Sequence, residues 1–262
     1  MATMAIPIVI VDRHFAEASA LFNPNAFPAV IRGEASSCGD RLAILTHSVE
    51  IVVREPALDR SRLLKEIREN KAFTGFTPSA DKPAVLVLHN LAFVSGLYSS
   101  FIAVKSLLDL YSRLIARSLV PSASIFGFNR ANYKGRNLSG GRFLKWMEKS
   151  APRSFDSRER LVAILLTHIN DWVNEAVAYR DAVVHDGFIA GITEAMVPLD
   201  KALTELRETD VQLPMMPGEI AITDYCTRLV GSVRALISET LPLLPNIDLG
   251  LLSLEKVNRP AV

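Results

Sequence analysis

Three residues near position 180 combine the side chains that acid–base chemistry on a phosphate requires. Arg180 carries a permanent positive charge, Asp181 follows it directly, and His185 lies four residues after the aspartate. Arginine can bind a phosphate through two N–H donors, and histidine exchanges protons near neutral pH. Residues four apart share a helix face, so a hydrogen bond from Asp181 can orient the imidazole of His185.

The separation of Arg180 and His185 does not identify a site by itself. In a chain with five histidines and many arginines such a pair is expected by chance, and Arg41 and His47 form one with nearly the same separation. The context of Arg180 is different. A carboxylate follows it near the end of a predicted amphipathic helix, His185 falls in the last turn, and Gly187 favours helix termination.

Helix geometry adds a condition to any shared chemistry. On an ideal helix Arg180 and His185 point about 140° apart. Both can reach one cleft if the helix ends or bends near His185, if the long arginine bridges the gap, or if two chains contribute. The alternative is a helix-terminal histidine favoured by the helix dipole, beside an ordinary Asp181–His185 pair.

The segment Arg180-Asp181-Ala182-Val183-Val184-His185 resembles the motif of the HEPN superfamily, in which an arginine precedes a polar residue and, a few residues later, a histidine. Two long predicted helices, a short helix before the motif helix and a C-terminal helix also agree with a HEPN bundle. The resemblance covers roughly residues 40–245, and only the six-residue motif is specific.

The resemblance implies a homodimer in which two copies of the motif face one cleft. It implies a metal-independent endoribonuclease, in which His185 is the general acid or base, Arg180 the phosphate clamp and Asp181 the orienting residue. A toxin or host-defence role follows, with an antitoxin as a possible partner. Other HEPN proteins only bind RNA or mediate assembly, so a non-catalytic RNA-binding or protein-interaction module is the alternative.

A second candidate surface precedes the motif helix. The glycine-rich segment 121–141 and the residues after it are basic, and aromatic side chains are interleaved. Lysine and arginine neutralise phosphates, while aromatic rings stack on bases. We expect the RNA backbone to contact Arg130, Lys134, Arg136, Arg142 and Lys145. The alternative is a solvated loop in which Phe143 and Trp146 anchor a short helix.

Hydrophobic periodicity predicts a mainly α protein, a HEPN-like helical bundle with two long helices. Helices are predicted over residues 60–71, 84–119 and 142–149, from 156 to a stop at Gly187, and from 220 or 222 to 241. Residues 40–55 suit a helix or, at 51–53, a strand. Asp156 and Glu159 form a capping-box pattern at the start of the motif helix.

The remaining segments are expected to be appendages. Residues 1–39 read as an irregular N-terminal arm packed on the body, residues 40–245 as the HEPN-like helical domain, and residues 246–262 as a loosely held tail. Segments 195–199 and 211–215 look extended and predict a small β-hairpin, which the prolines confine to an edge.

Composition narrows the setting. A net charge of +1 gives no global field for nucleic acid, so RNA binding needs a local patch. Cys38 and Cys226 match no metal spacing and suggest buried thiols in a reducing compartment, hence a cytoplasmic protein. Residues 83–104 lack formal charge but carry several polar side chains. We therefore expect a buried helix there and no membrane association, and the alternative is a helix at residues 84–104 that spans a membrane.

Cofactor motifs are not apparent. No glycine-rich phosphate loop followed by Lys-Ser/Thr and no Gly-x-Ser-x-Gly elbow occurs in the sequence. His168 and Asp171, three residues apart, could share a metal ion, but two ligands without a third are a weak signal. We expect no cofactor and no metal site.

Overall fold

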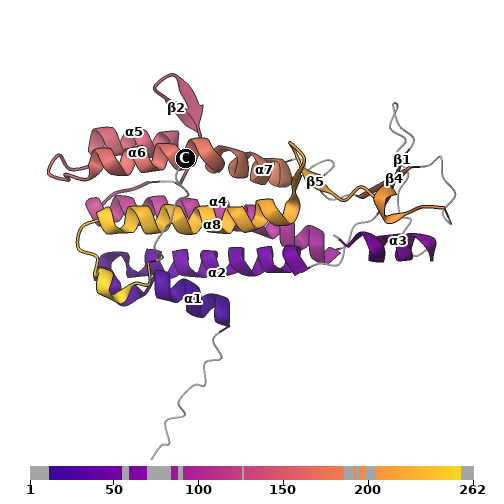
Figure 1. Cartoon of the computed structure of the whole chain (residues 1–262). Helices are drawn as coiled ribbons and strands as arrows, with labels where there is room; N and C mark the ends of the chain where they lie inside the picture. The colour runs from indigo at the N-terminus through magenta and orange to yellow at the C-terminus, as the bar shows by residue number, and fades with distance from the viewer. Residues whose placement is uncertain are drawn as a thin grey trace, which may run out of the picture.

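The computed structural model describes residues 12–54, 59–69, 84–87, 91–125, 127–185, 192, 195–198 and 205–254. The protein is mainly helical, as the periodicity predicts. Long helical segments pack side by side in a bundle, with the shorter elements at its ends and on its surface (Figure 1). The bundle contains α2 (Arg32–Arg54), α4 (Leu91–Leu119), α6 (Arg158–His168) continuing into α7 (Asn174–His185), and α8 (Ile222–Thr240).

The helix α4 lies at the centre of this bundle. It packs against α2 and α7, while α8 packs against α2 and α6. Where α4 crosses α2, a Cβ on Gly96 would lie 3.0 Å from the side chain of Ile51 and 3.2 Å from the carbonyl oxygen of Ser48. The small residue lets the two helices approach closely. Phe101, in the same half of α4, is fully buried.

The apolar character of α4 matches its central place. By length and composition α4 could cross a membrane, but a core helix of a water-soluble protein passes the same test, and most of its apolar window is buried. Its second half stays largely buried, and even Lys105 is only 7% exposed. Asp109 accepts a hydrogen bond from Lys105 at 2.5 Å, which compensates that buried charge.

The start of α4 differs from the prediction. The helix expected from residue 84 begins at Leu91, and residues 84–87 form strand β1 (Ala84–Val87) instead. Leu91 in the first turn of the helix is 80% exposed. A short apolar run that contains two valines suits a strand as well as a buried helix, so periodicity alone could not place this boundary.

The N-terminal segment is more regular than predicted. Apart from residues 1–11, which lie outside the described residues, the expected irregular arm contains α1 (Arg13–Leu21), η1 (Pro24–Ala26), η2 (Ala29–Ile31) and the first turns of α2. Asp12 caps α1 by accepting the backbone N–H of His14 at 2.8 Å. Gly39 does not break α2, because it faces α1, where a Cβ would lie 3.5 Å from Phe22.

The C-terminal segment also differs from the expected loose tail as far as residue 254. After η6 (Leu241–Leu243) the chain returns to the N-terminal elements and forms η7 (Leu249–Leu251). The backbone N–H groups of Asp248 and Ser253 donate to the carbonyl oxygens of Ala26 and Ala20 at 2.9 and 2.8 Å. The two ends of the described chain therefore stabilise each other.

Residues 127–141 form an ordered hairpin where the sequence suggested a structureless loop. Strand β2 (Ala131–Tyr133) pairs antiparallel with β3 (Arg136–Leu138), and Lys134 and Gly135 both have positive φ in the turn between them. Two such residues match the twist of a tight hairpin. The short helix expected next is confirmed as α5 (Gly141–Ser150).

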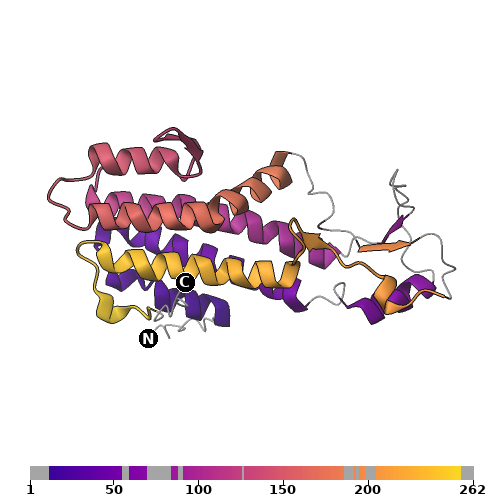
Figure 2. The ribbon, with the colours of Figure 1, turned by 45° about the horizontal axis from the view of Figure 1, so that its top comes forward.

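The hairpin predicted from segments 195–199 and 211–215 is wrong. Strand β4 (Ala195–Pro198) pairs with β1, whereas β5 (Met215–Met216) pairs with β6 (Ile220–Ala221). With α3 (Arg60–Arg68), which Asp59 caps, β4 belongs to a small second cluster beside the end of the bundle (Figure 2). Strands β1 and β4 are far apart in the sequence, so a local residue pattern cannot predict that they pair.

The predicted motif helix exists but contains an irregular turn. Its first residue is Arg158, preceded by Ser157, and the expected capping box of Asp156 and Glu159 does not form. Between α6 and α7 the chain makes a π-turn, η4 (Ile169–Val173), without interrupting the helix. Single π-turns are rare in helices, and those that occur are often found at functional sites.

Candidate functional site

The predicted motif lies at the end of α7, where the sequence placed it. The helix ends at His185, whose side chain is exposed, while Arg180 and Asp181 are partly exposed. Val184 beside the histidine is 48% exposed. The subsequent Gly187 lies outside the described residues. The motif is therefore on the surface of this chain, with its histidine open to a ligand or to another protein.

Arg180 and Asp181 form an ion pair. The arginine Nη1 donates to Asp181 Oδ1 at 2.9 Å, and both side chains are about one-third exposed, at 31% and 37%. In the described part of the chain no hydrogen bond joins Asp181 to His185, so the expected orienting contact does not form in this conformation. The carboxylate holds the guanidinium instead of the imidazole.

This ion pair affects how far apart Arg180 and His185 point, which is about 140° on an ideal helix. Asp181 is about 100° from Arg180 around the helix and about 40° from His185. By reaching to Asp181, the guanidinium is drawn toward the face on which His185 lies. The length of the arginine side chain thus narrows the gap that an ideal helix leaves between the two groups.

Aromatic packing fixes α7 on the bundle just before the motif. The ring of Tyr179 lies 5.3 Å from that of Phe101 in α4 and 5.7 Å from that of Tyr225 in α8, measured between centroids. Its hydroxyl donates to Glu175 at 3.0 Å. Burial, and then this hydrogen bond, raise the pKa of Tyr179 to about 12, so it is a neutral anchor rather than an acid–base group.

The predicted basic surface is exposed, but its aromatic residues are not available for base stacking. Every basic residue proposed for RNA contact is exposed: Arg130, Lys134, Arg136, Arg142 and Lys145. Tyr133 and Phe143 are buried, and the partly buried Trp146 stacks on Phe143 with ring centroids 6.1 Å apart. The aromatic residues anchor the hairpin and α5 in the core, and the surface offers charges alone.

One of these basic residues is paired with a carboxylate. Glu148 on α5 accepts hydrogen bonds from the Tyr133 hydroxyl at 2.5 Å and from the Lys134 ammonium at 2.8 Å. The hydrogen bond to Glu148 raises the pKa of Lys134, and the same contact lowers the pKa of the carboxyl. Among the residues predicted to contact RNA, Lys134 is therefore the least free to leave its carboxylate partner and bind a phosphate.

The hairpin is attached to the motif helix at the π-turn. Arg136 donates to the side chain of Asn170 at 3.0 Å, and the backbone N–H of Ser139 donates to Asn174 Oδ1 at 2.8 Å. Asn174 lies six residues before Arg180, about 9 Å along the helix axis. By helical periodicity Asn174, Asp181 and His185 fall within about 20° of one line on α7. The basic hairpin and the motif therefore share one side of this helix.

His168, considered above as a metal ligand with Asp171, is engaged in the core. Its Nδ1 accepts a hydrogen bond from Trp172 at 2.9 Å, and its Nε2 lies 3.3 Å from Glu239 Oε2. The side chain is buried, whereas Asp171 is exposed. With Nδ1 accepting, the proton resides on Nε2 and points to the carboxylate. The pair is a structural link between the π-turn and α8.

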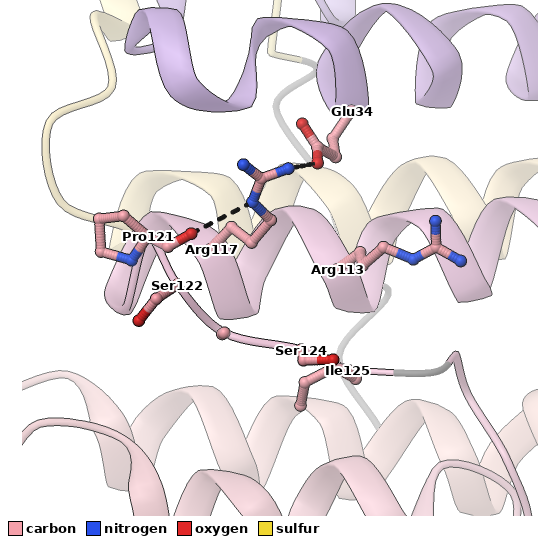
Figure 3. A pocket seen from close by; sticks show the side chains of 8 residues that line it. Glu34, Arg113, Arg117, Pro121, Ser122, Ser124 and Ile125 are labelled. Atoms are coloured by element: carbon pink, nitrogen blue, oxygen red, sulfur yellow. Dashed lines mark hydrogen bonds and ion pairs between the residues drawn. The ribbon is translucent and has the colours of Figure 1, made fainter.

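A cavity of about 450 Å³ lies where the start of α2 meets the end of α4. Figure 3 shows Arg117 between Glu34, with which it forms an ion pair, and the carbonyl oxygen of Pro121, to which it donates at 3.4 Å. Arg113 extends along the same cavity. The arginine bound to Glu34 joins two helices, and the exposed Arg113 is the other cation among the lining residues. One exposed arginine is too little to define an anion-binding site.

A cluster that sequence reasoning missed joins α1 and α2. His14, His47 and Glu50 each place one potential ligand atom within 4.8 Å of the other two. His47 and Glu50 are three residues apart on α2, a spacing that puts both on one face. His14 lies more than thirty residues earlier, and only the packing of α1 on α2 brings it near. The His47–Glu50 spacing was the one signal available in the sequence.

Comparison with known proteins leaves the family open. No protein-family model matches the chain, and neither a curated protein nor a solved structure is significantly similar to it.

Proposed function

We propose that the chain is a metal-independent endoribonuclease of the HEPN type, with Arg180, Asp181 and His185 as its centre. The observation that carries the proposal is the ion pair of Arg180 and Asp181 at 2.9 Å, one turn before an exposed histidine at a helix end. It supports the proposal because it holds a cation on the side of the helix where His185 lies.

The reaction uses the 2′-hydroxyl of RNA as the nucleophile. Its oxygen attacks the adjacent phosphorus, the bond from phosphorus to the 5′-oxygen breaks, and the products are a 2′,3′-cyclic phosphate and a 5′-hydroxyl end. His185 accepts the proton of the 2′-hydroxyl or supplies one to the leaving 5′-oxygen. Arg180 binds the phosphate oxygens, on which negative charge develops. Asp181 positions the arginine.

The active form in this proposal is a cytoplasmic homodimer. A second copy supplies the other acid–base group, because one exposed histidine cannot serve both oxygens at the same moment. The basic hairpin and α5 bind the RNA backbone, and the placement of Asn174 in line with the motif supports a continuous path. A toxin or host-defence role, with an antitoxin as partner, belongs to the same proposal.

Cleavage of an end-labelled single-stranded RNA in the presence of a chelator tests the proposal. We expect wild type to release fragments with 2′,3′-cyclic phosphates, and no cleavage at a position carrying a single 2′-deoxy substitution. His185→Ala and Arg180→Ala should each lower the cleavage rate by about 10²- to 10⁴-fold. Arg41→Ala, which removes an exposed arginine of α2, is the matched control and should cleave like wild type.

The alternative is a non-catalytic RNA-binding or interaction module, and the exposed charges on the hairpin favour RNA as its ligand. Salt-sensitive RNA binding without fragments in any preparation would select this alternative. Full activity in both His185→Ala and Arg180→Ala would instead place cleavage elsewhere in the chain.

A further inference from the structure

The group of His14, His47 and Glu50 has the composition of a transition-metal site. His14 is in the first turn of α1, and the other two residues share a face of α2. Two imidazole nitrogens and one carboxylate oxygen form a ligand set that Zn²⁺ uses in proteins, with a further position for water. The three ligand atoms lie within 4.8 Å of one another, so small side-chain rotations can bring them to bonding distance of one ion.

The condition of His14 provides a second, independent observation. Its side chain is 7% exposed, and its Nε2 lies 2.6 Å from Glu50 Oε2. Its Nδ1 is buried without a hydrogen-bond partner among the described residues. Buried imidazole nitrogens are normally hydrogen-bonded. The protein thus buries an imidazole beside a carboxylate and a second imidazole, with Nε2 facing the carboxylate and Nδ1 without a partner.

The arginines around Glu50 are compatible with this assignment. Arg13 and Arg54 both pair with Oε1, whereas Oε2 faces His14. The two arginines therefore bind one oxygen of the carboxylate, while the other oxygen contacts the imidazole that would share the ion with it. Their positive charge weakens cation binding.

The group is accessible from solvent. A cavity of about 370 Å³ is lined by Arg13, His14, Glu17 and Glu50, with Thr227 and Val230 of α8 on its other side. His47 is exposed. An ion can enter without opening the bundle, and water can complete its coordination.

We propose that His14, His47 and Glu50 bind one divalent transition-metal ion such as Zn²⁺ and that this ion fastens α1 to α2. The site does not depend on the proposed function. The helix α1 packs on α2, whereas the motif helix α7 packs on α4, and Figure 1 shows α4 and α8 between them.

Calorimetric titration of the chelator-treated full chain with ZnCl₂ tests the proposal. We expect one Zn²⁺ per chain and a higher melting temperature when Zn²⁺ is in excess, since a ligand that binds only the folded state stabilises it. Titration with Co²⁺ should produce visible d–d absorption bands that Zn²⁺ removes by displacement. These readouts are separate from RNA cleavage in chelator, so either proposal can fail without the other.

Variants locate the ion. His47→Ala removes an exposed side chain, so it should fold normally and bind Zn²⁺ at least tenfold more weakly. Glu50→Gln should do the same, and it keeps the proposal testable if His14→Ala, which empties a buried position, fails to fold. Glu17→Gln in the same cavity and His185→Ala on α7 should retain wild-type affinity. No saturable binding by wild type, unchanged binding by His47→Ala, or loss of binding by His185→Ala would each overturn the assignment.

Discussion

At the residue scale, the partner of Asp181 changes the interpretation of the motif. The sequence alone suggested that this carboxylate orients His185, whereas in the structure it holds Arg180 at 2.9 Å. If the proposed function is correct, Asp181 is a positioning residue for the phosphate-binding group. Its effect then reaches the reaction through the arginine.

Asp181→Asn tests this role. The substitution keeps the shape of the side chain but removes its charge, so Arg180 is no longer held toward the side of His185. We expect the RNA cleavage rate to fall by about 10- to 100-fold, because small losses of alignment are costly. The free energy of unfolding should change by less than about 1 kcal/mol, since the pair is partly exposed. Asp171→Asn, on the same helical segment, is the control for charge alone, and an equal effect from it would reject the positioning role.

Glu50 gives a prediction about pH. Its ordinary pKa of 4.5 is lowered to about 2, chiefly by the hydrogen bond from Arg13. A carboxylate with a lowered pKa stabilises the folded state fully above its ordinary pKa, and this contribution disappears as the pH falls from about 4.5 through about 2. Wild type should therefore exceed Glu50→Gln in unfolding free energy at pH 7, and the difference should shrink toward pH 2. Urea denaturation at pH 7 and pH 2 measures this difference in unfolding free energy. A difference that does not change with pH would contradict a lowered pKa of Glu50 in the folded state.

At the element scale, two glycines near the hairpin have different reasons to be there. Gly135 has a φ of +83° in the β2–β3 turn, but a Cβ would meet nothing within 4 Å. Gly141 begins α5 where a Cβ would lie 2.2 Å from the carbonyl oxygen of Ala131. Gly135 is needed because the turn requires a positive φ, and Gly141 is needed because only a residue without a Cβ lets α5 pack this closely against strand β2.

The two alanine variants should separate these reasons. Gly135→Ala should destabilise the protein by about 1 kcal/mol, the cost of a left-handed conformation for a residue with a Cβ. Gly141→Ala should cost about 3 kcal/mol or more, since backbone atoms must move to relieve the contact. Chemical denaturation gives both values. Equal costs would show that the approach of α5 to β2 is looser than the structure indicates.

The helices that the sequence predicted well are those whose apolar residues follow one continuous face. The buried face of α8 is Ile222, Tyr225, Leu229, Val233, Leu236 and Ile237, as the spacing indicates. The prediction for residues 32–39 was wrong because glycine and serine lower local helix propensity, whereas the packing of Gly39 against α1 favours the helix. The pairing of β1 with β4 and the meeting of His14 with His47 depend on contacts between distant segments.

At the scale of the whole molecule, the main core includes residues from both ends of the described chain and both cysteines. Cys38 on α2 and Cys226 on α8 are free and buried, as expected from their isolation in the sequence. Burial raises the pKa of both thiols, that of Cys226 to about 12. Neither thiol is a reactive group in the folded protein.

Thiol labelling should therefore report on opening of the bundle. In native buffer both cysteines should react with a disulfide reagent orders of magnitude more slowly than in the unfolded chain, because reaction requires exposure of the core. Both should react rapidly and completely in denaturant. The rate of colour development, followed with and without urea, measures this. Rapid native labelling of Cys38 would mean that α1 and α2 separate readily, and added Zn²⁺ should then slow it if the proposed site exists.

The π-turn at Ile169–Val173 has a consequence for how the protein is aligned. Widening one turn is equivalent to inserting one residue, and each residue advances a helix by about 100°. The segment before the turn is fixed by His168 and Glu239, and the segment after it by Tyr179. The wide turn therefore takes up one residue without rotating the helical segment that follows it. If the same sequence formed a regular α-helix through this turn, Asp181 and His185 would be rotated by about 100° relative to α6.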